Sequence, residues 1–365
     1  MTTIQDSGLA ESLPRTARVL SDGIESGLHR GGQVYVSFRG EPVVNAGVGE
    51  AAAGQPMTRT TLNLWRSSGK PMTAAALLRV FEERGLDVTD LVQSHLPEFA
   101  PPDVRIVDLL AHNSGLPNEQ LGWPAASWNE IVAKACQLRR DPSVKAAYSY
   151  SATWFLLGEV LRRLVGADQS YAEIMRSSVF EPLGMHDTWN GMSADVWAEN
   201  QHRIAEQDTV MPGGRRRAER LHQQASCVAA SPGSNLRSTA RDVGRFYEAL
   251  HGGEYFRKPT TLAKMTTAHR EGVTDATFKA DVRVGLGVIL ASPDPNVPYG
   301  FGDHASGQTY GHGGAQCAMA FCDPLSELVV AWVVNGFPGE PKHQARNRAI
   351  NTAIYEDLVG RRSEN

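Results

Sequence analysis

Ser67 and Lys70 are the two residues of this sequence whose types and spacing most clearly suit covalent chemistry. They belong to the stretch Ser67-Ser68-Gly69-Lys70, where a polar segment turns into a helical pattern. Residues i and i+3 share one face of a helix, so the lysine amine can lie against the serine hydroxyl. A neutral neighbouring amine can take the proton of a serine, which is otherwise a poor nucleophile. The alternative is structural: the serine caps the helix and the lysine stays in solvent as a surface charge.

Two further stretches place polar side chains beside predicted helices or strands. They are Pro142-Ser143-Val144-Lys145-Ala146-Ala147-Tyr148-Ser149-Tyr150 and Tyr310-Gly311-His312-Gly313-Gly314. With the S-x-x-K stretch, they resemble the serine β-lactamase and penicillin-binding-protein superfamily. The resemblance is to the branch with class C β-lactamases, family VIII carboxylesterases, DD-peptidases and related transacylases. Residues 108–117 (DLLAHNSGLP), 183–185 (LGM) and 231–242 (SPGSNLRSTARD) match the same superfamily in the same order.

The resemblance implies that a serine acyl-enzyme forms on Ser67, with Lys70 as its proton partner. Tyr148 would work with Lys70 as the general base and then protonate the leaving group. A tyrosine of ordinary pKa ~10 needs a nearby cation to act as a base near neutral pH, and Lys70 could supply it. Tyr150 is the competing candidate, because some members place this tyrosine closer to the following helix. Pro142 stands six residues before Tyr148, which matches the usual lead-in and favours Tyr148.

The stretch His312-Gly313-Gly314 occupies the position where β-lactamases and DD-peptidases usually carry K-T-G. A mostly neutral imidazole holds a substrate carboxylate poorly, so His312 is expected to position substrate or to be structural. The resemblance implies that the N–H groups of Ala315 and Ser67 form an oxyanion hole. Tyr150 stands where the superfamily's Tyr-x-Asn has its asparagine. Both differences from the superfamily pattern, at His312 and at Tyr150, argue against a reaction with penicillins.

These candidate residues must be positioned by strands at both ends of the chain and by helices between them. Strands are expected at 33–38, 42–47, 283–291, 318–321 and 327–334, and helices at 8–30, from 67 onward, 107–111, 128–138, 153–165, 170–178, 239–251, 258–267 and 342–360. We therefore expect one α+β, β-lactamase-like catalytic unit over residues 1–365. Residues 1–86 and 268–365 would form an antiparallel sheet flanked by helices, and residues 87–267 an inserted all-helical lobe. The cleft between the two lobes would hold the active site.

Composition restricts the partners and the compartment. The 365 residues carry a net charge of −4, which disfavours nucleic acid, and the run Arg215-Arg216-Arg217 is expected to be a solvated loop or a site for an anionic substrate. No stretch approaches the ~20 apolar residues that span a bilayer. The first thirty residues lack the apolar core of a secretory signal. Four scattered cysteines are expected to be buried free thiols. These features predict a cytoplasmic protein, monomeric or homodimeric.

The sequence thus predicts a serine acyl-transfer enzyme with no metal or organic cofactor. Its substrate would be a small-molecule ester or amide, and its acyl acceptor water, an amine or an alcohol. A carboxylesterase or a transacylase, including one that tailors a natural product, agrees with the altered K-T-G and Tyr-x-Asn positions and with the lack of an export signal. The alternative enzyme is a β-lactamase, DD-peptidase or D-aminopeptidase. The alternative of another class is a non-catalytic sensor or scaffold with this fold.

Overall fold

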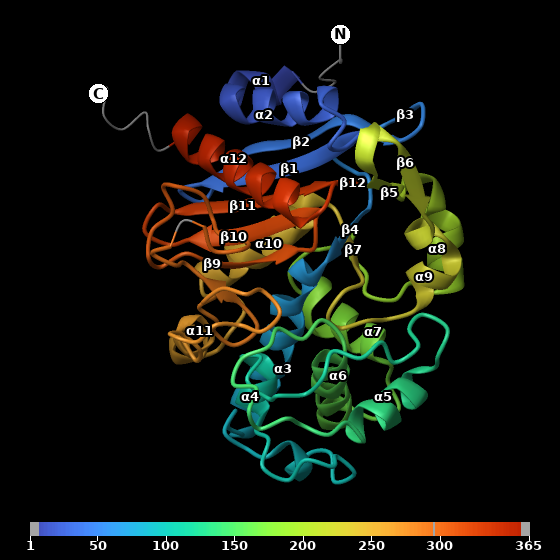
Figure 1. Cartoon of the computed structure of the whole chain (residues 1–365), viewed down its shortest axis with the longest axis vertical. Coiled ribbons are helices and arrows are strands. Elements are labelled where there is room, and N and C mark those ends of the chain that lie inside the picture. Colours follow the sequence, from blue (N-terminus) through green and yellow to red (C-terminus); the bar gives the residue numbers. More distant parts are fainter. Residues whose placement is uncertain (1–6, 295, 359–365) are drawn as a thin grey trace.

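Segments from opposite ends of the chain lie side by side in one antiparallel sheet. A computed structural model describes residues 7–294 and 296–358. Within them, seven strands form a sheet in the order β3-β2-β1-β11-β10-β9-β8 (Figure 1). The strands are β1 (Gly31–Phe38), β2 (Glu41–Ala52), β3 (Gln55–Pro56), β8 (Ile289–Leu290), β9 (Tyr310–Gly314), β10 (Ala318–Asp323) and β11 (Leu328–Val334). The pairing of β1 with β11 runs from Gly32 opposite Val334 to Phe38 opposite Leu328, so the N- and C-terminal parts build the sheet together, as predicted.

Helices cover both faces of this sheet. One face carries α1 (Ser7–Ser12), α2 (Pro14–Glu25) and α12 (Glu340–Leu358), whose side chains join those of the strands in one apolar core (Figure 1). The sequence predicted a single helix over 8–30, but the structure divides it before Pro14, whose missing N–H suits a first helical turn. Positions 359 and 360 of the predicted last helix lie outside the described residues. Every residue of β11 is buried, which explains its continuous apolar run.

The helical lobe is built around a long buried helix, α3 (Lys70–Arg84). The short 3₁₀ turn η1 (Ser67–Gly69) precedes it, so the predicted helix begins three residues later than Ser67. Around it lie α4 (Ile106–Leu110), α5 (Trp128–Cys136), α6 (Ala152–Val165), α7 (Tyr171–Met175) and α11 (Pro259–Thr266). One apolar core joins these helices to the second face of the sheet.

The segment 87–267 is not all-helical, contrary to the sequence prediction. It contains β5 (Gln207–Val210), β6 (Arg216–Glu219) and β7 (Leu236–Ser238), with α8 (Ala194–Asn200) and α9 (Gln224–Val228). The strand β5 pairs with β6 and with β12 (Gly336–Phe337), and β7 pairs with β4 (Asn63–Arg66). The polar sequences of β5 and β6 show no apolar alternation, and their pairing partners come from distant segments. The predicted loop 215–217 therefore lies partly in a strand, where Arg216 is 3.5 Å from Asp208.

Helix α10 (Ala240–His251), predicted within the helical lobe, packs instead on the sheet beneath β1 and β11 (Figure 1). Its close approach depends on Gly244, because a Cβ there would lie 2.2 Å from the Tyr35 ring. The four cysteines are free and buried, which confirms that prediction. Among the described residues, no helix combines the length and the apolar character that a bilayer crossing requires.

Candidate active site

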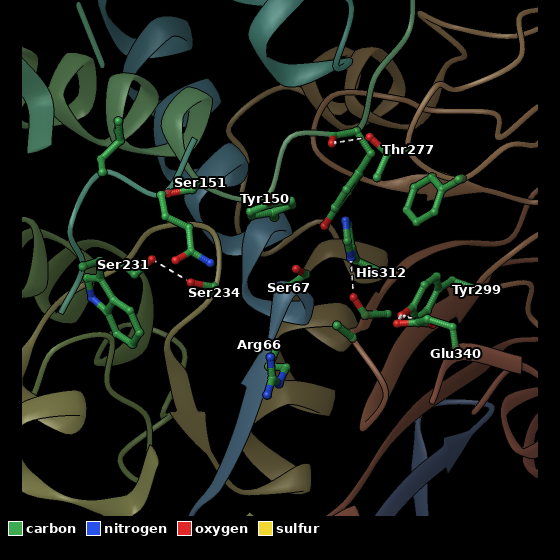
Figure 2. Close-up of a pocket in the computed structure, with 17 residues that line it drawn as sticks. Arg66, Ser67, Tyr150, Ser151, Ser231, Ser234, Thr277, Tyr299, His312 and Glu340 are labelled. Atoms are coloured by element: carbon green, nitrogen blue, oxygen red, sulfur yellow. Dashed lines mark hydrogen bonds between the residues drawn. The ribbon is translucent and has the colours of Figure 1, made fainter. Parts of the chain in front are cut away.

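Ser67 lies at the point where strand β4 ends and the helical lobe begins. It is 7% exposed and faces the cleft, at the start of the turn that leads into α3 (Figure 2). The neighbouring Ser68 is fully buried, and its Oγ donates a hydrogen bond of 3.0 Å to the His312 carbonyl oxygen. The structure therefore gives the two serines different tasks: Ser67 faces the cavity, and Ser68 ties the turn to β9.

Lys70 lies within hydrogen-bonding distance of Ser67. Its Nζ is 3.0 Å from Ser67 Oγ and donates a 2.6 Å hydrogen bond to the Gly233 carbonyl oxygen. The side chain is fully buried, and burial lowers the pKa of the amine well below its ordinary value. Lys70 is thus no solvated surface charge, which removes the structural alternative for this residue.

Tyr148 packs against the Lys70 amine, which lies 5.1 Å from the centre of its ring. Burial raises the pKa of Tyr148 above its ordinary value, and a hydrogen bond with the Ser67 side chain partly opposes this shift. Burial therefore favours the neutral forms of both the Tyr148 phenol and the Lys70 amine. That a Lys70 cation helps Tyr148 to act as a base stays a prediction.

The segment around Tyr148 is held by contacts from several other segments. The His112 ring packs 4.5 Å from the Tyr148 ring, and its Nδ1 accepts a 3.0 Å hydrogen bond from the Ser149 N–H. The Thr277 hydroxyl donates to the Tyr148 carbonyl oxygen at 3.0 Å. Thr277 belongs to a loop braced by the buried ion pair of Arg270 with Asp275, whose atoms lie 2.8 Å apart. These contacts fix the phenol relative to Ser67.

Tyr150, the competing tyrosine, lies at the rim of the same cavity. It is 40% exposed, and its hydroxyl donates a 3.3 Å hydrogen bond to the Asn118 carbonyl oxygen. Its backbone N–H is bound by the Asn118 side chain. The ring borders the entrance (Figure 2). The structure thus brings Tyr148, rather than Tyr150, to the serine and lysine.

His312, Gly313 and Gly314 lie on β9, the strand beside the nucleophile. Burial lowers the pKa of His312 to about 3, so its imidazole is neutral, and its Nδ1 lies 2.7 Å from the Gly313 carbonyl oxygen. Both glycines are required by close packing. A Cβ on Gly313 would lie 2.0 Å from the Tyr299 ring, and one on Gly314 would lie 2.3 Å from the Trp65 carbonyl oxygen. Small residues therefore let β9 run directly alongside the start of the turn that carries Ser67.

Ala315 follows β9 and borders the cavity with Ser67. Among the residues that the structure describes, neither residue's backbone N–H donates to another backbone group. Two free N–H groups next to a nucleophile are suited to bind the oxygen of a reacting carbonyl. This arrangement supports the pair predicted for an oxyanion hole.

The cavity beside Ser67 has a volume of about 520 Å³ and receives residues from both lobes. Sequence reasoning missed several of its lining residues, namely Arg66, Gln120, Leu121, Trp123, Thr277, Phe278, Tyr299 and Glu340. Most belong to loops without periodic patterns, so only their places in the fold reveal them. In the described part of the chain, no group of three His, Cys, Asp or Glu side chains is arranged to hold a metal ion.

The fold and the site place this protein in the serine β-lactamase and penicillin-binding-protein superfamily, a superfamily of serine hydrolases. The family model described as Beta-lactamase matches residues 16–354, so the chain belongs to that family. Over 335 residues it is 25% identical to "Putative D-alanyl-D-alanine carboxypeptidase" of Salmonella agona (strain SL483), covering 82% of this chain and 73% of that protein.

Two solved structures share the fold. One is described as a family VIII carboxylesterase: it has a TM-score of 0.78 and 23% identity, over 95% of this chain and 98% of that one. The other, EstCE1, is described as a hydrolase with promiscuous acyltransferase activity. It has a TM-score of 0.78 and 22% identity, over 97% of this chain and 100% of that one. At these identities the two likenesses concern the fold.

Proposed function

We propose that the protein is a serine acyl-transfer enzyme, a carboxylesterase or transacylase that works through an acyl-enzyme on Ser67. The observation that carries this proposal is the buried Lys70 amine, 3.0 Å from the Ser67 hydroxyl oxygen and with a lowered pKa. Because a neutral amine has a free lone pair, the same contact can run from the serine hydroxyl to the lysine nitrogen. Ser67 can then attack a carbonyl carbon while Lys70 accepts its proton.

The resulting tetrahedral oxyanion would be bound by the N–H groups of Ser67 and Ala315. Proton transfer makes Lys70 an ammonium group, 5.1 Å from the centre of the Tyr148 ring. This new positive charge favours loss of the Tyr148 proton, which goes to the departing alkoxide. The lysine proton then restores the phenol, so the net transfer runs from the serine to the leaving group.

The second half-reaction transfers the acyl group from Ser67 to an acceptor. The same groups act in reverse: they remove a proton from water, an amine or an alcohol as it attacks the acyl-enzyme. An ester donor with an amine or alcohol acceptor, as in a tailoring step of natural-product assembly, suits a site without the superfamily's K-T-G lysine and Tyr-x-Asn amide. The description of EstCE1 as a hydrolase with promiscuous acyltransferase activity supports this choice.

A β-lactamase, DD-peptidase or D-aminopeptidase is the second candidate. The curated relative described as a D-alanyl-D-alanine carboxypeptidase favours it. Against it stand the neutral, buried His312 in the K-T-G position and Tyr150 in place of the asparagine. A non-catalytic scaffold fits less well, because it has no need for a buried amine beside an accessible serine.

An added acceptor should speed consumption of a p-nitrophenyl ester and divert its acyl group from water. An acyl-enzyme in a partly water-excluding cleft survives long enough to partition between water and a better nucleophile. The measurement follows p-nitrophenol release and free carboxylic acid together, with a panel of amines and alcohols. We expect total release to rise with the acceptor while the hydrolysis product falls.

Nitrocefin supplies the contrasting substrate for this experiment. We expect weak or no turnover, because the site lacks the superfamily's K-T-G lysine and its Tyr-x-Asn amide. A kcat/KM for nitrocefin of ~10⁶ M⁻¹s⁻¹ or more, typical of good enzymes, would overturn the ester proposal and favour the β-lactamase.

Tyr148→Phe should lower kcat by ~10²–10⁴-fold with a much smaller change in KM, because it removes a proton-transfer group. Tyr150→Phe is the matched control, since it deletes the same hydroxyl at the rim, and it should change kcat far less. Steady-state kinetics with one p-nitrophenyl ester compare the two variants. An inactive Tyr150→Phe with an active Tyr148→Phe would show that the tyrosine assignment is wrong.

A further inference from the structure

Arg66 is the residue directly before the proposed nucleophile, and its side chain lines the cavity (Figure 2). In the described chain, the cavity wall holds one carboxylate, that of Glu340, and one other basic side chain, that of His312; the Lys70 amine lies beside Ser67 without lining the wall. Both of these, Lys70 and His312, have lowered pKa values because they are buried. Arg66 is therefore the permanent positive charge at this wall.

In the described part of the chain, no carboxylate oxygen lies within 4.0 Å of the Arg66 guanidinium, so it forms no close ion pair. Glu219 is further away: its pKa is lowered by hydrogen bonds to Thr209 and Arg217 and, more weakly, by the charge of Arg66. The Arg66 Nε is buried and has no hydrogen-bond partner, while the guanidinium carbon lies 4.3 Å from the centre of the Phe337 ring. Stacking on Phe337 explains how the group is positioned, and in the described chain neither terminal nitrogen donates a hydrogen bond to the protein, so their N–H groups are available to a ligand. A charged donor that makes no hydrogen bond within the protein can bind a ligand oxygen without first breaking an internal contact.

The backbone at Arg66 is strained as well. Its φ of 48° and ψ of −127° lie in a region that residues with a Cβ rarely adopt. A glycine would adopt this conformation without the penalty. Such an outlier beside a nucleophile favours a functional reason for the side chain. The strained backbone and the unpaired guanidinium are independent observations that point to one residue.

We propose that Arg66 binds a carboxylate of the ester substrate, so that the enzyme prefers esters that carry one acidic group. This inference rests on the proposed acyl-transfer function and names its substrate class. The planar guanidinium can donate two parallel hydrogen bonds to a carboxylate, and its half-buried position limits screening by salt. Glu340 lies at a different part of the cavity wall (Figure 2) and repels a carboxylate there. The two charges thus orient an acidic ester with its carboxylate toward Arg66.

The test compares charged and neutral forms of the same ester on wild type and Arg66→Gln. In the first pair, adipic acid mono-4-nitrophenyl ester carries a carboxylate on its acyl chain, and methyl 4-nitrophenyl adipate is its neutral counterpart. In the second pair, 4-acetoxybenzoate carries the carboxylate on its leaving group, and methyl 4-acetoxybenzoate is its neutral counterpart. We expect the charged-to-neutral ratio of kcat/KM in one of the two pairs to fall by about 10–100-fold in Arg66→Gln. The pair that responds identifies the part of the ester that carries the carboxylate.

Two further variants separate charge recognition from packing. Arg39→Gln is the matched control, because Arg39 also has a positive φ (56°) and lies 5.1 Å from a phenyl ring, but it sits in the β1–β2 turn outside the cavity lining. It should leave both ratios unchanged. Glu340→Gln should raise the ratio that depends on Arg66, because it removes the repelling charge.

An unchanged ratio in both pairs for Arg66→Gln, or a wild-type preference for both methyl esters, would overturn the inference while leaving the acyl-transfer function intact. Calorimetric titration with adipate gives a readout that needs no turnover. We expect adipate to bind wild type at least about 10-fold more tightly than Arg66→Gln. If no ester is consumed, this titration still decides on Arg66, and equal adipate affinities would refute it.

Discussion

Ser67→Ala is expected to abolish ester turnover and covalent labelling by a fluorophosphonate. Loss of the nucleophile in a serine hydrolase lowers kcat by roughly 10⁶-fold, because no other group can carry the acyl intermediate. Folding should be little affected, because Ser67 Oγ faces the cavity and Lys70 keeps its 2.6 Å hydrogen bond to the Gly233 carbonyl oxygen. The measurements are kcat for p-nitrophenyl acetate, the intact mass after labelling, and the thermal midpoint.

Ser68→Ala is the matched control for this variant. The change removes the 3.0 Å hydrogen bond to the His312 carbonyl oxygen, a loss of about 0.5–1.5 kcal/mol in the free energy of unfolding. Labelling and turnover should persist with a modest decrease. Equal labelling of the two variants would contradict the assignment of the nucleophile.

Lys70→Met is expected to lower kcat by ~10²–10⁴-fold with little change in KM. Methionine fills a similar volume in the buried site but has no amine to take the Ser67 proton. Lys70→Arg should be comparably inactive, because a guanidinium stays protonated. Both variants are measured by steady-state kinetics, and a rate near that of wild type for Lys70→Met would refute the role of the amine.

The pH dependence gives a second readout of Lys70. Burial lowers the pKa of this amine in the folded enzyme, and only the neutral form accepts the serine proton. In wild type, kcat/KM should therefore rise with pH through the lowered pKa and then level off. The residual rate of Lys70→Met should lack this limb of the profile. If kcat/KM rises with pH in the same way in wild type and in Lys70→Met, the rise belongs to another group.

Much of the site could be predicted because its chemistry depends on local sequence patterns. The S-x-x-K spacing and the helical pattern that follows it predict that Ser67 and Lys70 share one face. The structure shows the resulting contact at 3.0 Å. Sequence spacing cannot give burial, however, and burial decides the protonation of Lys70 and Tyr148. The sequence leaves open whether the resting Lys70 amine is neutral or charged, whereas its burial in the structure favours the neutral form.

Other features depend on contacts between distant segments and leave no pattern in the sequence. The strands β5 and β6 are short and polar, and they form by pairing with β12 and with each other. Thr277 and Tyr299 reach the cavity from irregular loops of the sheet lobe. Arg66 looks like an ordinary surface residue in the sequence, because neither its positive φ nor its unpaired guanidinium can be read from residue types.

The most direct test of the central claim is detection of the acyl-enzyme itself. Wild-type protein is mixed with p-nitrophenyl acetate, quenched with acid within one turnover, digested and analysed by peptide mass spectrometry. We predict one acetyl group on the peptide that contains Ser67, localised to this serine by fragmentation and absent in Ser67→Ala. An acetyl group on Ser68 or Tyr148 instead, or release of p-nitrophenol with no covalent intermediate at any time, would contradict the account.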